Sequence, residues 1–461
     1  MAHILNITSD SRRVQPGDTF VAIKGFTVDG HDYIEKAIEN GATRIICEHG
    51  SYSVETTVVE NSEKWLNEML VENVSPQFSE MKFVGITGTN GKTTTAYLVS
   101  QMLNALGMKA AYIGTIGFYV GGELIRELPN TTPDVLAMYN LILESKSKGA
   151  DTVIMEVSSH ALYYGRINGI KFDVAAFTNL TEDHLDFHKT MEAYLETKVK
   201  LVDYIKDGGT MIVNADDPAS EAFKAPVVKS IGLASEGNGA DYHVKSYKYN
   251  IATTDMVIGC GDRDYELKTN LLNKFNLYNY TLAAAITNNL GYSMEDIIGI
   301  TGDVYPPSGR NEIIEVEGAK AVIDYAHTPD AVEKIIEANL EDKTGQVITV
   351  IGCGGDRDPI KRPIMGEIAT RLSDYVIFTD DNPRTEDHEK IMEDILKGVN
   401  TDNYEVVLDR AKAIRKGLKK LEPGDSLLIL GKGHEDYQIL GHEKVHFSDR
   451  EQVIKYLKRR R

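Results

Sequence analysis

Cysteine, tryptophan and long apolar runs are all scarce in this sequence. The three cysteines, Cys47, Cys260 and Cys353, lie far apart without paired spacing, which argues against a disulfide framework or a zinc site. No apolar run approaches the roughly 18 residues that a membrane helix needs. The opening residues, MAHILNITSDSRR, also lack the apolar core of a signal peptide. We therefore expect a soluble, cytoplasmic protein with reduced thiols.

Basic residues are outnumbered by acidic ones, with 50 Lys and Arg against 69 Asp and Glu and a net charge of -19. This balance argues against a general binder of nucleic acid or of anionic membrane surfaces. An anionic small molecule needs only a local basic pocket, so it is not excluded. The 461 residues, of which 42% are hydrophobic, are enough for roughly two to four domains with ordinary cores.

One stretch near the start carries the clearest chemical signal. Residues 82–86 alternate and are β-rich, residues 87–91 form a small loop with glycines, and residues 92–105 carry apolar side chains at helical spacing. A strand, a glycine loop and a helix that opens with Gly-Lys-Thr cradle phosphates, because backbone N–H groups and the helix N-terminus face the anion. Lys92 adds a charge and the Thr93 hydroxyl can ligate Mg²⁺. We expect a nucleoside triphosphate site here, the alternative being an ordinary βα turn.

Strand-like and helix-like segments alternate along the rest of the chain, which predicts an α/β fold with mostly parallel sheets. A polar stretch around Pro76 and a break in composition at residues 305–310 are typical of domain boundaries. We therefore expect three domains, at residues 1–80, 81–308 and 309–461.

Two polar loops follow strands of the predicted central domain. Glu156 comes at the end of a strand over 152–155, and His184 lies in the loop after a strand over 174–178. Ligand sites in parallel sheets lie beyond the carboxyl ends of the strands, so both side chains can reach the phosphate loop. With Thr93 and the acidic neighbours Glu182, Asp183 and Asp186 they form a candidate site for one or two Mg²⁺ ions, although histidine is a less usual ligand for that ion. The alternative for His184 is a histidine that caps a helix or packs in the core.

The last third of the chain also places polar loops after its strands. Arg357 and Arg384 each follow a strand, and the guanidinium fork matches a carboxylate; the alternative is a structural ion-pair partner. Pro383 stiffens its loop and gives Arg384 a defined direction. The Gly-Lys-Gly sequence at 431–433 has no Ser or Thr after the lysine, so we interpret it as a substrate loop and not as a second phosphate loop.

Together these loops resemble those of the Mur ligases, the ATP-dependent amide-forming enzymes of peptidoglycan synthesis. The resemblance covers nearly the whole chain, and its motifs occur in order at 88–94, 130–132, 156–160, 179–186, Asn276 with Asn279, 309–310, 324–328 and 431–435. Within the family, the motifs at 10–12, 352–357 and 381–384 resemble those of the ligases that extend UDP-N-acetylmuramoyl-L-alanyl-D-glutamate by a third amino acid.

The resemblance implies an α/β, three-domain Mur ligase architecture with an N-terminal UDP-binding domain, a central ATP-binding P-loop sheet and a C-terminal Rossmann-like domain that binds the amino acid. It implies ATP-binding residues Gly88, Thr89, Asn90, Gly91, Lys92, Thr93, Thr94, Asn276, Asn279, Arg310, Asp324 and His327. It implies UDP-substrate contacts at Ser9, Ser11, Phe26, Thr27, Val28, Asn130, Thr131, Thr132, Ser158 and Arg166. It implies an amino-acid site made of Arg357, Asp381, Asn382, Pro383, Arg384, Gly431 and Glu435.

The resemblance further implies that Lys92, Glu156, His184 and Lys198 are catalytic and that Thr93, Glu156, His184 and Lys198 hold Mg²⁺. On residue type alone Lys198 is a surface lysine. The family, however, carries a carbamylated lysine at this position, a carboxylate that orients a second Mg²⁺.

One residue departs from the family pattern. Two residues before Arg166, where the family usually has Gln, this chain has Tyr164. A specialised paralogue therefore remains an alternative.

The expected reaction uses ATP to convert the glutamate carboxylate into an acyl phosphate, which the incoming amine attacks. An arginine at 384 suits a distal carboxylate and repels the ammonium of a lysine substrate. In the family, the motif at 381–384 marks members that add meso-diaminopimelate, so this is the expected substrate; L-lysine or another diamino acid is the alternative.

Three alternative functions do not involve this reaction: a motor or switch NTPase, a folylpolyglutamate-type ligase, and an inactive binding paralogue. We expect a monomer that acts on small molecules and binds neither nucleic acid nor membrane.

Overall fold

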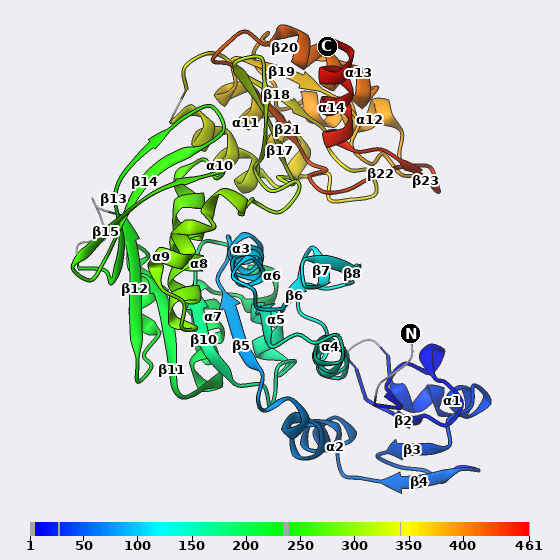
Figure 1. Ribbon diagram of the computed structural model, residues 1–461. Coiled ribbons are helices and arrows are strands. Elements are labelled where there is room, and N and C mark those ends of the chain that lie inside the picture. Colours follow the sequence, from blue (N-terminus) through cyan, green and yellow to red (C-terminus); the bar gives the residue numbers. More distant parts are fainter. Residues whose placement is uncertain (1–4, 26–27, 234–238, 342, 461) are drawn as a thin grey trace. The chain divides into compact units, whose positions relative to one another are not determined.

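The computed structural model describes the chain except for residues 1–4, 26–27, 234–238, 342 and 461. Its Cα positions group into two compact units, Met1–Asp241 with Leu282–Ile297 and Tyr242–Thr281 with Ile298–Arg461. Figure 1 labels the helices and strands of both units. The predicted domain boundaries near residues 80 and 308 stay predictions.

The first unit begins with a small parallel sheet. Its strands are β1 (Ile7–Thr8), β2 (Thr19–Val21), β3 (Arg44–Cys47) and β4 (Glu55–Val58), paired in that order. Helix α1 (Ile34–Glu39) packs against it through Ile34 and Ala37, which share an apolar cluster with Phe20 and Ile45. Cys47 is buried in the same cluster and unpaired, as the cysteine spacing predicts.

The central sheet of this unit has the strand order β12-β11-β10-β5-β9-β6-β7-β8. The strands are β5 (Lys82–Thr87), β6 (Ala110–Gly114), β7 (Gly117–Val120), β8 (Glu123–Arg126), β9 (Thr152–Glu156), β10 (Phe172–Phe177), β11 (Ile205–Asn214) and β12 (Val228–Leu233). The pairs from β6 through β9, β5, β10 and β11 are parallel, whereas β7 pairs antiparallel with β6 and β8. Parallel strands end at the same edge, so the loops after β5, β9 and β10 are brought together, as predicted.

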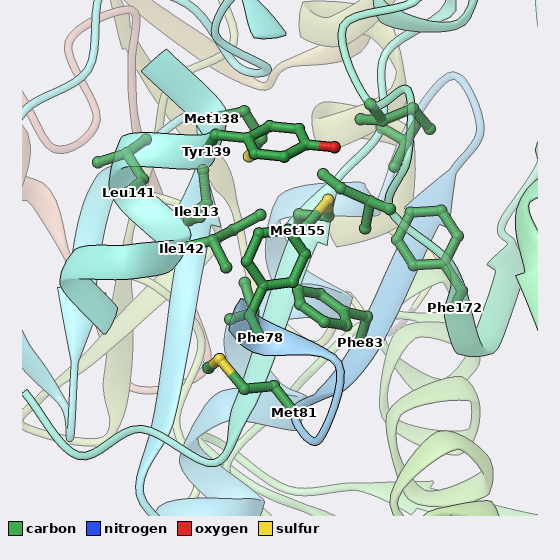
Figure 2. Close-up of a cluster of buried hydrophobic side chains, with 14 of the residues drawn as sticks. Phe78, Met81, Phe83, Ile113, Met138, Tyr139, Leu141, Ile142, Met155 and Phe172 are labelled. Atoms are coloured by element: carbon green, nitrogen blue, oxygen red, sulfur yellow. The ribbon is translucent and has the colours of Figure 1, made fainter. Parts of the chain in front are cut away.

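The helices of the first unit are α2 (Ser62–Met69), α3 (Lys92–Ala105), α4 (Val135–Ser147), α5 (Ser159–Tyr163), α6 (Leu185–His188), α7 (Met191–Val199) and α9 (Met294–Gly299); α8 (Lys274–Asn289) is divided between the units. Figure 2 shows the apolar cluster that joins α4 to the sheet. The ring of Phe78 lies edge-on to Phe83 at 5.6 Å and to Tyr139 at 5.4 Å. This packing fixes the segment that leads into the phosphate loop.

The second unit contains the antiparallel run β15-β14-β13 and a sheet of order β16-β17-β21-β18-β19-β20. The strands are β13 (Tyr242–Tyr249), β14 (Thr254–Cys260), β15 (Arg263–Thr269), β16 (Glu312–Val316), β17 (Ala319–Asp324), β18 (Val347–Ile351), β19 (Tyr375–Phe378), β20 (Tyr404–Val406), β21 (Ser426–Leu430) and the hairpin β22 (Tyr437–Leu440) with β23 (Glu443–His446). From β17 to β20 all neighbours in the second sheet are parallel.

Helices cover both faces of that parallel sheet. Apolar side chains of α10 (Pro329–Leu340), α11 (Lys361–Leu372) and α12 (His388–Leu396) form one cluster with it, and those of α13 (Arg410–Lys420) and α14 (Asp449–Arg460) form another. A parallel sheet with helices on both faces is the doubly wound, Rossmann-like arrangement that the sequence predicts for this region. Among the described helices, none has the length and apolar character needed to cross a bilayer.

Candidate active site

The phosphate loop joins β5 to α3, as predicted (Figure 1). Gly88 and Gly91 have φ angles of 143° and 83°, which favour glycine, and a Cβ at Gly88 would collide with the hydroxyl of Thr178. Lys92 Nζ donates hydrogen bonds to the carbonyls of Gly88 at 2.9 Å and Thr89 at 2.8 Å. The Lys92 side chain therefore curls back over the loop, which places its charge at the phosphate site.

The loop after β10 holds the phosphate loop in place. Asn90 N donates to Asn179 Oδ1 at 3.0 Å, and Thr178 Oγ1 donates to the Asn90 carbonyl at 2.6 Å. Thr89 N donates to the Asn179 carbonyl at 2.8 Å. The 88–94 and 179–186 motifs are therefore joined by direct hydrogen bonds.

Glu156, at the end of β9, has no exposed surface and is surrounded by donors. Its carboxylate accepts from Thr93 Oγ1 at 2.9 Å, from Thr115 N at 2.8 Å and from the Tyr112 hydroxyl. The predicted pairing of Thr93 with Glu156 is thus present. Sequence reasoning missed Tyr112 and Thr115; the signal was their place in and just after β6, which pairs with β9.

The Thr93 hydroxyl and the Glu156 carboxylate offer neighbouring oxygen atoms at the first turn of a phosphate-loop helix. Oxygen ligands beside a phosphate site are what Mg²⁺ uses in proteins, so the donor set fits this ion. In the described part of the chain, no three His, Cys, Asp or Glu side chains cluster as a metal site. The complete predicted set, with His184 and Lys198, stays a prediction.

His184 lies at the start of α6 with a φ angle of 53° and a side chain that is 47% exposed. Its Nε2 is 3.5 Å from Asp183 Oδ2, and its ring lies 5.1 Å from that of His160. A half-exposed histidine in a strained conformation differs from a packed core histidine, whereas the capping alternative holds for its backbone: His184 is the N-cap residue of α6, although its side chain forms no cap hydrogen bond.

Lys198 is 1% exposed, which contradicts the expectation of a surface lysine that residue type alone suggests. Its Nζ donates to the Gly88 carbonyl at 2.8 Å and lies 4.3 Å from the centre of the Tyr194 ring. Burial lowers the pKa of Lys198 well below its usual value, the charge of Lys92 lowers it further, and Asp183 opposes both. Burial and the like charge of Lys92 therefore make the charged form of this amine less favourable than in an ordinary lysine.

The predicted UDP-substrate residues of the central domain are connected to one another. Thr132 Oγ1 donates to the Glu156 carbonyl at 2.8 Å and accepts from Ser158 N at 3.1 Å. Arg166 donates to the Thr132 carbonyl at 2.9 Å, and the Thr131 and Thr115 hydroxyls lie 3.0 Å apart. This group therefore adjoins the Glu156 carboxylate.

A second group lies around a pocket of about 220 Å³ in the first unit. Ser9 and Asn130 of the predicted set line it, together with Arg13 and Arg126, which sequence reasoning missed. Burial lowers the pKa of Arg126, and the neighbouring Arg13 charge lowers it further. Asp10, Glu127, Asp134 and Glu144 also line this pocket, and Arg126 forms an ion pair with Glu144, so the pocket carries charge of both signs.

Four more predicted UDP-substrate residues, Ser11, Phe26, Thr27 and Val28, belong to the N-terminal module. Ser11 is buried and its carbonyl accepts from Asn40 Nδ2 at 2.8 Å, whereas Val28 is 52% exposed. Phe26 and Thr27 lie outside the described residues. Tyr164 stands where the family usually has Gln. The Arg166 guanidinium carbon lies over the Tyr164 ring, 5.6 Å from the ring centre.

The remaining predicted ATP residues belong to the second unit. Asn279 Nδ2 donates to Asn276 Oδ1 at 3.0 Å, and both side chains are buried. The Arg310 guanidinium lies 4.9 Å from the centre of the Tyr325 ring. Burial raises the pKa of Asp324, and the charge of Arg310 opposes that rise.

The His327 ring is 4.6 Å from that of Tyr325. Together with Arg310 and Asp324, it forms an aromatic and charged cluster.

The predicted amino-acid loops follow β18, β19 and β21. Arg384 has a φ angle of 54°, and its guanidinium donates to the Gly355 carbonyl at 2.8 Å. A Cβ added to Gly354 would lie 3.0 Å from that guanidinium and 3.7 Å from Arg357 Cγ, so both arginines border this glycine. Among the described residues neither guanidinium forms an ion pair, which contradicts the alternative of structural ion-pair partners.

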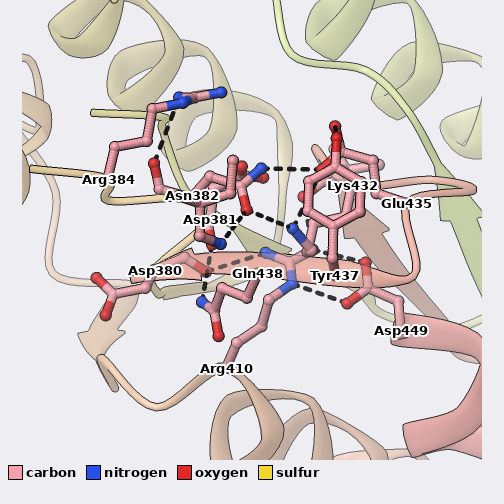
Figure 3. A network of polar contacts seen from close by, with 12 residues as sticks. Asp380, Asp381, Asn382, Arg384, Arg410, Lys432, Glu435, Tyr437, Gln438 and Asp449 are labelled. Atoms are coloured by element: carbon pink, nitrogen blue, oxygen red, sulfur yellow. Dashed lines mark hydrogen bonds and ion pairs between the residues drawn. The ribbon is translucent and has the colours of Figure 1, made fainter. Parts of the chain in front are cut away.

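Asn382 anchors the loops to one another (Figure 3). Its Oδ1 accepts from Lys432 Nζ at 3.0 Å and from Ile439 N at 3.0 Å, while its Nδ2 donates to Glu435 Oε2 at 2.9 Å. Among the described residues, only one of the two Asn382 Nδ2 hydrogens has a hydrogen-bond partner, and the side chain is buried. Burial raises the pKa of the neighbouring Asp381, and the charge of Lys432 opposes that rise.

Two buried arginines that sequence reasoning missed support these loops. Arg410 pairs with Asp449, both without exposed surface, and also donates to the carbonyl of Leu430 at 3.0 Å. Arg362 pairs with Glu386 at 2.6 Å and donates to the Gly354 carbonyl at 3.3 Å. Partners this far apart in sequence give no local signal.

Comparison with known proteins agrees with this geometry. The Mur ligase middle domain matches residues 86–287, the Mur ligase glutamate ligase domain matches 309–433, and the catalytic domain of the Mur ligase family matches 3–78. The chain belongs to the Mur ligase family, and as such it is an ATP-dependent ligase of peptidoglycan synthesis.

Within the family, the chain is similar to ligases named for 2,6-diaminopimelate. The chain is 40% identical to a UDP-N-acetylmuramoyl-L-alanyl-D-glutamate--2,6-diaminopimelate ligase 1 of Clostridium acetobutylicum, over 98% of this chain and 94% of the relative. It is 37% identical to the corresponding 2,6-diaminopimelate ligase of Bacillus cereus, over 97% and 93%.

Solved structures agree. One of a 2,6-diaminopimelate ligase superposes with a TM-score of 0.72 at 29% identity, covering 99% of this chain and 95% of the other. The folylpolyglutamate synthase of Thermotoga maritima shares the fold at 18% identity and a TM-score of 0.62, but covers only 79% of this chain.

Proposed function

We propose that the protein joins meso-diaminopimelate to the glutamate of UDP-N-acetylmuramoyl-L-alanyl-D-glutamate at the expense of ATP. The full-length similarity to ligases of that name supports the substrate pair. The observation that carries the proposal is Arg384, an arginine without an ion-pair partner among the described residues, held beside Gly354 by a loop whose Asn382 is fixed by Lys432 and Glu435. The distal carboxylate of a diamino acid would neutralise the charge of the Arg384 guanidinium.

The chemistry begins at the phosphate loop. A glutamate carboxylate oxygen of the substrate attacks the γ-phosphorus of ATP, ADP leaves, and an acyl phosphate forms. Lys92 and the backbone N–H groups of residues 88–93 stabilise the negative charge of the phosphoryl group in transit. An amine of the amino acid then attacks the acyl carbon, inorganic phosphate leaves, and the nitrogen loses a proton.

Thr93, Glu156, His184 and Lys198 as its carbamate would hold Mg²⁺. When bound there, the ion would neutralise charge on phosphate oxygens. A neutral amine is the form that reacts with carbon dioxide, so the burial that lowers the pKa of Lys198 supports the carbamate. Its hydrogen bond to Gly88 would place the carbamate next to the phosphate loop.

The UDP-linked substrate would occupy the first unit. Ser9, Asn130, Arg13 and Arg126 line a pocket where their hydroxyl, amide and guanidinium groups would contact the nucleotide. Thr131, Thr132, Ser158 and Arg166 adjoin Glu156 and would hold the muramoyl peptide near the phosphate loop. Ser11, Phe26, Thr27 and Val28 remain proposed contacts to the uridine.

The nucleotide base and ribose of ATP would contact Asn276, Asn279, Arg310, Asp324 and His327. The Tyr325 and His327 rings, with the charged groups of Arg310 and Asp324 beside them, suit a purine ring and its sugar hydroxyls. We further propose that the enzyme works as a monomer in the cytoplasm.

Phosphate release tests the proposal. The purified protein is given ATP, Mg²⁺ and UDP-N-acetylmuramoyl-L-alanyl-D-glutamate, with meso-diaminopimelate, L-lysine, lanthionine or no amino acid. We expect release only with an amino acid and the highest specificity constant with meso-diaminopimelate. A preference for L-lysine would overturn the substrate assignment. Release with no amino acid would indicate a motor or switch, and no release at all an inactive paralogue.

A further inference from the structure

Helices α13 and α14 lie side by side on one face of the C-terminal sheet (Figure 1). The Tyr456 hydroxyl of α14 donates to the Leu418 carbonyl of α13 at 3.3 Å. Between the helices opens a hollow of about 360 Å³, lined by Ala411, Gln452 and Tyr456 and by four basic side chains. We call this hollow the α13–α14 groove.

The four basic side chains of the groove are Arg415, Lys419, Lys455 and Arg459. Each helix supplies two of them, one turn apart, so they stand at the corners of a four-sided patch. All four are exposed, and no acidic residue lines the groove. In the described part of the chain, none of the four forms an ion pair or a hydrogen bond.

Neighbouring cations on the same helix behave differently. Lys412 pairs with Asp409 at 3.2 Å, Lys416 pairs with Glu405, and Lys420 lies 4.1 Å from the centre of the Tyr375 ring. Cations one turn apart repel each other, and this protein has a large excess of acids with which to pair them. The four groove cations are therefore an unbalanced local concentration of positive charge on an acidic protein.

We propose that the α13–α14 groove binds a compact polyphosphate, a molecule that carries two or more linked phosphoryl groups. Side chains one turn apart are about 6 Å from each other, and packed helices lie roughly 8–10 Å apart, so a di- or triphosphate reaches all four cations. Arginine forks bind phosphate oxygens in pairs, and lysines add point charges. The ring of Tyr456 and the aliphatic stems supply the floor.

Larger anionic partners fit the groove less well. Among the described side chains of α13 and α14, no large hydrophobic one is exposed, whereas helices that bind membrane surfaces insert such side chains. A net charge of -19 repels a long polyanion or an anionic bilayer more strongly than a small molecule that fits within the groove.

Binding of inorganic triphosphate to three full-length proteins tests the proposal. The groove variant is Arg415→Gln with Lys455→Gln. The control variant is Lys412→Gln with Lys416→Gln, which removes the same charge from exposed, ion-paired positions. Because the phosphate loop binds the same probe in all three proteins, the groove site is the component of binding that the groove variant loses. Phosphate release by the ligase reaction, unchanged in both variants, shows that each is folded.

We expect the groove component to weaken by about 10- to 100-fold in the groove variant, to persist in the control, and to fall steeply with salt. A parallel titration of the three proteins with ATP separates the two sources of a phosphate chain, since a groove component that is tighter for ATP than for triphosphate would show that the groove also recognises a nucleoside. Equal triphosphate binding by all three proteins would overturn the proposal. So would groove-dependent binding to phosphatidylglycerol vesicles or duplex DNA without any groove component for triphosphate.

Discussion

The Thr93 hydroxyl donates a hydrogen bond to the Glu156 carboxylate across 2.9 Å, joining the first turn of α3 to the end of β9. Residues 63 positions apart thus meet at the edge of one sheet. The phosphate loop adjoins this pair. Lys198 is hydrogen-bonded to the Gly88 carbonyl of that loop, and Thr132 is hydrogen-bonded to the Glu156 carbonyl. Substitutions in and around this site should therefore have specific effects on activity or stability.

Lys92→Ala should reduce phosphate release by at least about 10²-fold, because the loop loses its side-chain charge on the transferred phosphoryl group. The far-ultraviolet circular dichroism spectrum and the urea midpoint should stay close to wild type. Lys109→Ala, which removes an exposed lysine, is the control. Near-wild-type turnover of Lys92→Ala would refute the phosphate-loop assignment.

Lys198→Ala should be inactive and should regain part of its activity when short carboxylic acids are added, because these replace the carbamate oxygens. In wild type, ¹³C-bicarbonate should give a carbamate signal in the nuclear magnetic resonance spectrum that is absent from the variant. Lys200→Ala, an exposed lysine two positions along, should keep both activity and signal. A free amine at Lys198 in a fully active, metal-bound crystal would contradict carbamylation.

The lowered pKa of Lys198 also predicts a pH dependence of stability. Between the folded pKa and the ordinary value near 10.4, the unfolded chain binds one more proton than the native chain, so the free energy of unfolding rises with pH in that window. Urea unfolding in chelator and carbon-dioxide-free buffer measures it. Lys198→Met should remove this contribution, and parallel pH profiles of the two proteins would count against it.

Arg384→Ala should lower the specificity constant for meso-diaminopimelate by roughly 30- to several-thousand-fold, which corresponds to about 2–5 kcal/mol for a carboxylate left without its partner. Discrimination against L-lysine should fall with it, because the repulsive guanidinium is gone. Arg371→Ala, which removes an exposed arginine on α11, is the matched control. Full discrimination in Arg384→Ala would show that this loop does not read the substrate.

Arg410→Met should destabilise the protein by about 3–5 kcal/mol, because it leaves Asp449 buried without a partner. The double variant Arg410→Met with Asp449→Leu should recover much of that loss. Removing the exposed pair of Arg371 and Glu333 should change stability by less than about 1 kcal/mol. Urea unfolding compares the variants, and equal stability of Arg410→Met and wild type would contradict this role.

The sequence by itself determined the elements whose information is local. The phosphate loop is contiguous, and its glycines, lysine and threonine follow a strand and begin a helix, so their order was enough to predict both structure and ligand. The alternation of strands and helices likewise predicted mostly parallel sheets, because each element carries its own periodicity, whereas the Rossmann-like C-terminal domain was implied by the family resemblance.

The tertiary structure decided the features that depend on distant partners. Burial reversed the interpretation of Lys198, and packing put Tyr112 and Thr115 on Glu156. The Arg410–Asp449 pair joins residues 39 positions apart. The physical reason is that a side chain's solvation and charge partners are set by elements that chain folding brings together, and no local pattern records them.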